Sequence, residues 1–133
     1  MTWSRKRMAL LISPVVALLL AFAFVNAPSA AASTDIPTYS ITGSSTWFVA
    51  AGDHVFVKDT VADGYTALAR VQVAYDGFYS NVWCPGGAGT TCDGNFDFTE
   101  QKTIGIEPCI GVYNGGVNPV VLSCAAAYRL GVT

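Results

Sequence analysis

The chain has 133 residues, with seven Lys and Arg, nine Asp and Glu, and a formal net charge of −2. Beyond position 32 only four basic residues remain, scattered at Lys58, Arg70, Lys102 and Arg129. This argues against nucleic acid or an anionic membrane as the partner, because phosphate binding needs clustered Lys and Arg. The length suits one domain with a modest hydrophobic core.

The first 32 residues have the three parts of a secretory signal peptide. A basic start, Arg5–Arg7, precedes an almost wholly apolar run, Ala9–Val25, and a small-residue cleavage site, Ala30–Ala32. A membrane anchor is the alternative, since the apolar run reaches the short end of spanning lengths, but no basic stop follows it. We therefore expect residues 33–133 to be secreted as one extracellular domain that has no membrane contact. Four basic residues against nine acids give this domain a net charge of −5.

Short segments with a two-residue alternation of apolar and polar positions follow one another through the mature chain. The longest, Tyr65–Tyr75, places its small and branched apolar residues on one face and is the expected central strand. The other expected strands are 39–42, 46–50, 54–58, 78–83, 95–99, 103–113 and 120–128. Pro108 marks an edge position or a bulge within its strand. Seven or eight short strands with turns between them predict an all-β Greek-key sandwich, and a small closed β-barrel is the alternative.

Four cysteines allow three disulfide pairings. When the last two expected strands fold back about a turn centred after Gly116, residues whose numbers sum to 233 face each other, which pairs Cys109 with Cys124. The glycine-rich loop between Cys84 and Cys92 brings those two together. We expect the bridge at Cys109 to matter more for stability, because it joins two strands whereas the other closes a loop. Neither C-x₂-C nor closely spaced histidines are present, so a zinc site is disfavoured.

Two features carry a resemblance: the segment Asp59–Gly64 followed by the alternating central strand, and the cysteine in the final strand. Over roughly Asp53 to Val132 the chain resembles small secreted β-sandwich proteins of Streptomyces-type actinobacteria. The resemblance implies an immunoglobulin-like sandwich of unknown role and no catalytic residue. Tendamistat-like amylase inhibitors share the size and the two-disulfide plan, but the Trp-Arg-Tyr tripeptide that they use is absent here.

His54 is the only histidine, so a Ser-His-Asp or Cys-His site would have to use it. No G-x-S-x-G nucleophile elbow is present. A histidine at the start of a solvated strand face is the simpler interpretation.

Asp93, Asn95 and Asp97 match the opening of a calcium-binding loop. Phe98 and Ile104 stand where such a loop needs Gly and a bidentate Glu. The outward face of a strand explains the same acids, and we expect no metal and no cofactor. A pair of carboxylates for glycoside hydrolysis stays open, because only separation in space decides it.

Aromatic residues near the loops are too many for a small core to bury. We expect Trp47, Phe48, Phe78 and Tyr79 to bind a partner through an exposed patch, and Trp83 to pack in the core. The predicted function is a non-catalytic, monomeric secreted module that binds a protein or a cell-wall polysaccharide. An inhibitor of an extracellular hydrolase and a small extracellular hydrolase are the alternatives.

Overall fold

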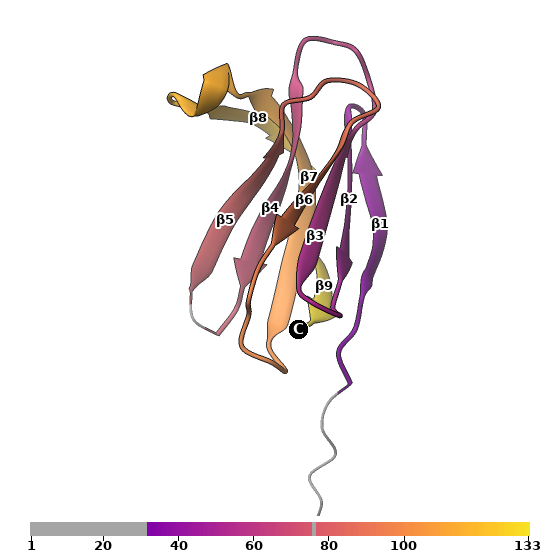
Figure 1. Ribbon diagram of the computed structural model, residues 1–133, viewed down its shortest axis with the longest axis vertical. Helices are drawn as coiled ribbons and strands as arrows, with labels where there is room; N and C mark the ends of the chain where they lie inside the picture. The colour runs from indigo at the N-terminus through magenta and orange to yellow at the C-terminus, as the bar shows by residue number, and fades with distance from the viewer. Residues whose placement is uncertain (1–31, 76) are drawn as a thin grey trace, which may run out of the picture. The chain divides into compact units, whose positions relative to one another are not determined.

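A computed structural model of the chain describes residues 32–75 and 77–133, which form two antiparallel β-sheets that face each other (Figure 1). The first sheet has the order β1-β2-β3-β6, with β1 Ile36–Ile41, β2 Ser44–Val49, β3 His54–Asp59 and β6 Thr91–Asn95. The second has the order β5-β4-β7-β8, with β5 Phe78–Cys84, β4 Thr66–Val73, β7 Thr103–Val112 and β8 Val120–Cys124, and β9 Arg129–Val132 also pairs with β7. The predicted signal peptide, except for its last residue, lies outside the described residues.

Two neighbouring pairs, β3–β6 and β4–β7, join strands that are far apart in sequence, which is the mark of a Greek key. The orders β2-β3-β6 and β4-β7-β8 repeat the A-B-E and C-F-G orders of an immunoglobulin-like sandwich. The predicted fold class is therefore confirmed, and the closed barrel is wrong. The described residues form nine strands instead of the predicted seven or eight. Across them no helix is long and apolar enough to cross a membrane.

The expected central strand corresponds to β4, which lies between β5 and β7. Its alternating apolar residues all point into the space between the sheets and are buried. Leu68 is buried on the opposite face, beside its cross-strand partners Trp83 and Cys109. The strand is shorter than expected, because Tyr65 and Tyr75 lie beyond its ends and are exposed.

The hydrophobic core lies between the two sheets and draws on both. The first sheet contributes Ile36, Phe48, Val55 and Val57, and the second contributes Ala67, Ala69, Val71, Val73, Cys84, Ile104 and Ile106. Phe98 closes the core from the connection between β6 and β7.

Both predicted disulfides are present. Cys109 and Cys124 are direct partners of β7 and β8, as the hairpin register predicts, and we call their bond the hairpin disulfide. Cys84 lies on β5 of the second sheet and Cys92 on β6 of the first, so their bond is the inter-sheet disulfide. Cys84 is fully buried in the core. The interpretation of this bridge as a mere loop closure is therefore wrong.

The strand expected at 120–128 is divided into β8 and β9. Both pair with β7, but Cys109 faces Cys124 whereas Ile106 faces Arg129, so the register changes by two residues between them. Pro108 lies at this break, and its carbonyl accepts a hydrogen bond from Ala125 at 3.0 Å. The nitrogen of Pro108 faces the same edge as its carbonyl and has no hydrogen to donate, so the ladder cannot continue there.

The strand expected at 95–99 also differs, because β6 ends at Asn95. The next residues turn inward instead of continuing the ladder. Phe96 donates its N–H to the backbone carbonyl of Asp53, and Phe98 donates to the buried Asp53 carboxylate at 2.8 Å. Phe98 thereby reaches the core.

Candidate functional site

The structure separates the aromatic residues that were expected to share one surface. Ser44, Thr46 and Phe48 of β2 point into the sandwich, so Trp47 points outward from the first sheet and is partly exposed. Phe48 is only 1% exposed, and its assignment to a binding surface is wrong. Successive residues of a strand point to opposite faces, so Trp47 and Phe48 cannot both be on one face.

The other two expected residues lie elsewhere. Phe78 is partly buried and packs edge-on against Phe96 and Phe98, with ring centroids 5.6 and 5.3 Å away. Tyr79 is 52% exposed and lies on the outer face of the second sheet. Trp47 and Tyr79 are therefore on opposite sides of the sandwich and cannot contact one small ligand together.

Trp47 belongs to a row of stacked rings on the outer face of the first sheet. Phe56 is its direct partner on β3, with ring centroids 5.2 Å apart and planes inclined by 15°. His54 stands two residues earlier on the same face of β3, with its centroid 5.7 Å from that of Phe56 and planes inclined by 16°. All three side chains are partly exposed. We call Trp47, Phe56 and His54 the ring row.

A carboxylate lies beside the ring row. Asp93 of β6 is the direct partner of Phe56, and its oxygens lie 2.8 and 3.0 Å from His54 Nδ1. The carboxylate only accepts hydrogen bonds, so Nδ1 carries the proton and donates it. The side chains of His54 and Asp93 are 30% and 40% exposed, so both can also contact a ligand.

Among the described residues no nucleophile is hydrogen-bonded to this histidine. In the described chain His54 hydrogen-bonds to Asp93 and to no hydroxyl or thiol. The Nε2 edge of its ring lies against the turn at Gly52, 3.1 Å from where a Cβ there would stand. A Ser-His-Asp mechanism needs a nucleophile hydrogen-bonded to the second ring nitrogen. The arrangement instead holds the imidazole in one orientation beside Phe56.

Both oxygens of Asp93, the first residue of the predicted calcium-loop opening, lie within hydrogen-bond distance of His54. Among the described residues one group of three possible metal ligands exists, Glu107 with Cys109 and Cys124. The two sulfurs are joined in the hairpin disulfide and cannot ligate an ion.

The outer face of the second sheet carries a polar cluster around Tyr79. Arg70 lies 5.8 Å from the centre of the Tyr79 ring and donates a hydrogen bond to the buried Glu107 at 3.2 Å. Partial burial lowers the pKa of the Arg70 guanidinium, but the hydrogen bond to Glu107 and the charges of Tyr79, Glu107 and Tyr128 together outweigh it, so the pKa lies above its ordinary value. Burial, and then the charge of Glu107, raise the pKa of Tyr128. The positive charge of Arg70 is therefore paired with the negative charge of Glu107 within the cluster.

Comparisons with known proteins found no matching family model, no matching curated protein and no matching solved structure. The geometry of the site therefore carries the functional argument.

Proposed function

We propose that the protein is a non-catalytic secreted module that binds a polysaccharide through the ring row of the first sheet. The observation that carries the proposal is the stack of Trp47, Phe56 and His54 on an open sheet face, with the Asp93 carboxylate beside it. The hydrophobic effect favours burial of aromatic side chains, so partly exposed stacked rings on a soluble domain are a candidate contact surface.

The chemistry of the row suits a sugar chain. The apolar rings can pack against the C–H groups of a sugar, while the Asp93 carboxylate accepts hydrogen bonds from its hydroxyls. The row runs across two strands and continues to a third through Asp93, so it follows an open line instead of lining a pocket. An extended polymer fits such a line better than a small compact ligand does.

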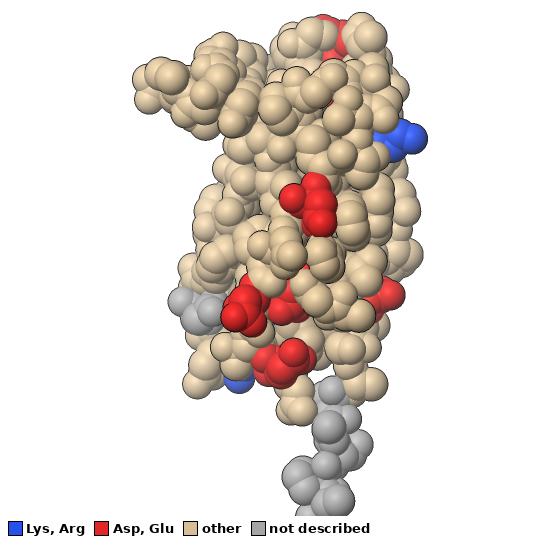
Figure 2. All heavy atoms as spheres, viewed as in Figure 1, with Lys and Arg blue, Asp and Glu red and all other residues tan. Residues whose placement is uncertain are grey.

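The surface charge supports a neutral or amino-bearing polymer. Figure 2 shows acidic groups spread over the viewed face, with basic groups only at its margins. Asp93 itself would repel an anionic chain at the ring row. The two disulfides support an extracellular location, where such bonds form and persist. We expect the mature form to begin at Ser33, which intact mass of the secreted protein would check.

The test is retention of the purified secreted protein on insoluble cellulose, chitin and cell-wall preparations. Trp47→Ala should reduce affinity by about 30-fold, because truncating an aromatic anchor often costs about 2 kcal/mol or more. Tyr79→Ala is the matched control, since it removes an exposed aromatic from the opposite sheet and should leave retention unchanged. Circular dichroism establishes that both variants fold. Equal retention of a folded Trp47→Ala protein, or no retention of the parent protein on any polymer, would contradict the proposal.

A further inference from the structure

A pocket of about 400 Å³ lies at one end of the sandwich, away from the ring row. The connection from β3 to β4 forms one wall, and the loop from β5 to β6, closed by the inter-sheet disulfide, forms the other. Two backbone hydrogen bonds join these walls, from Asp59 N–H to the carbonyl of Thr90 and from Gly89 N–H to the carbonyl of Asp59. The walls include apolar side chains, among them Val61, Pro85 and Ala88.

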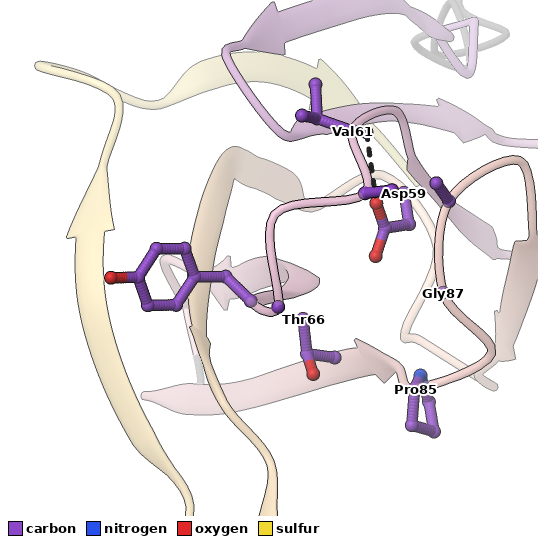
Figure 3. A pocket seen from close by; sticks show the side chains of 9 residues that line it. Asp59, Val61, Thr66, Pro85 and Gly87 are labelled. Carbon is purple, nitrogen blue, oxygen red and sulfur yellow. Dashed lines mark hydrogen bonds between the residues drawn. The ribbon is translucent and has the colours of Figure 1, made fainter.

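A carboxylate with an unused oxygen lies at the floor of this pocket. Asp59 is 1% exposed, and its Oδ1 accepts a hydrogen bond from the N–H of Val61 at 3.2 Å. Its Oδ2 is buried and has no hydrogen-bond partner in the described chain. Figure 3 shows this second oxygen pointing away from Val61, toward the space between Thr66 and Gly87.

The described chain brings no cation to this carboxylate. Lys58 precedes it on β3 and therefore points to the opposite, exposed face. Arg70 pairs with Glu107, while Lys102 and Arg129 lie over tyrosine rings. A buried carboxylate without a counter-charge is costly, so a positively charged ligand would be stabilised there.

We propose that this pocket binds a primary ammonium group carried on a short aliphatic chain. The ammonium donates to Oδ2 of Asp59, and the aliphatic chain packs between the apolar walls. Asp59 offers one unused oxygen, which suits a compact ammonium group better than a planar guanidinium, which prefers both oxygens of a carboxylate, or a metal ion, which needs several oxygen ligands. A free alkylamine and the lysine side chain of a peptide share this chemistry. The proposal does not depend on the ring row.

The test is a titration of the ¹⁵N-labelled protein at neutral pH with n-butylamine, followed by NMR, with n-butanol as the neutral analogue. The amine should shift the signals of residues 59–66 and 85–90 saturably, and the alcohol should not. Asp59→Asn keeps the shape and removes the charge, so it should weaken binding about tenfold or more. Asp63→Asn removes an exposed charge from the same connection and should bind like the parent. Equal binding of the alcohol, equal affinity of Asp59→Asn, or no saturable shift would overturn the proposal.

Two further arms complete the experiment. Ala88→Leu narrows the pocket without touching Asp59, so it should also weaken amine binding, and it decides the question if Asp59→Asn does not fold. Unchanged affinity of Ala88→Leu would count against the pocket. A peptide with one internal lysine, its termini blocked, distinguishes the source. Tighter binding of the peptide than of butylamine assigns the site to a protein partner, and equal or weaker binding assigns it to a free amine.

Discussion

Two adjacent residues of β2 should respond very differently to truncation. Phe48 is 1% exposed in the core, and Phe→Ala at such a site costs about 3–5 kcal/mol. Trp47 is partly exposed and stacks on Phe56, and such an aromatic pair contributes about 0.5–1.5 kcal/mol beyond the area it buries. For a domain of about 100 residues, each kcal/mol lowers the Tm by about 4–8 °C. We therefore expect Phe48→Ala to lower the Tm by at least about 12 °C and Trp47→Ala by a clearly smaller amount.

The assay is thermal and urea unfolding of the purified domain, residues 33–133, with both disulfides intact, followed by circular dichroism. Fluorescence is less suitable, because Trp47→Ala removes one of the two tryptophans of residues 33–133. Phe48→Leu is the control that retains most of the buried volume and should recover most of the loss. Equal destabilisation by the two alanine variants would refute the assignment of these residues to opposite faces, and with it the ring row as a free surface.

Three further outcomes are expected. Replacing both cysteines of the inter-sheet disulfide by alanine should lower the free energy of unfolding more than the same change at the hairpin disulfide. Chain entropy alone would give the opposite order, about 2.5 kcal/mol for the inter-sheet separation of 8 residues and about 3 kcal/mol for the hairpin separation of 15. The reason is that only the inter-sheet disulfide joins the two sheets. A larger loss of unfolding free energy for the hairpin double mutant, measured by urea unfolding, would contradict this prediction. The raised pKa of Tyr128 implies stability that is fully present below pH 10 and lost as pH rises through the raised value, so the parent should lose stability relative to Tyr128→Phe only above pH 10. Glu107→Gln should lower the pKa of Tyr128 but leave it above the ordinary value of a tyrosine, because burial is the larger cause of the shift. Ultraviolet titration of the tyrosines would measure this change.

Local patterns in the sequence predict the parts of the fold that depend on neighbours along the chain. Alternation identifies β4, and folding the last hairpin about its glycine-rich turn gives the register of Cys109 and Cys124. The same operation on the hairpin around Gly52 pairs Trp47 with Phe56, so most of the ring row was within reach of sequence reasoning. Because adjacent residues of a strand point to opposite faces, the sequence also predicts that Trp47 and Phe48 cannot belong to the same binding surface.

The remaining features depend on contacts between distant segments. Asp93 joins the ring row because β6 pairs with β3, and no local pattern indicates that pairing. The end of β6 depends on Asp53, whose carboxylate accepts the N–H of Phe98 across 45 positions. The role of Cys84 in linking the sheets likewise follows from the crossing of the chain between them. Secondary-structure propensity and hydrophobic periodicity are local properties, so they do not predict contacts between segments that are distant in sequence.

The break at Pro108 has a consequence for contacts between two copies of this protein. An uninterrupted edge strand offers a row of free N–H and C=O groups on which a second molecule can add its own strand. Here that border of the second sheet consists of β8 and β9, of five and four residues, offset by a step of two. A straight incoming strand can match one piece or the other but not both. One proline, by withholding a single hydrogen, thus interrupts the border on which a second molecule could add a strand, and the bridge between Thr34 and Val132 covers part of the β9 piece.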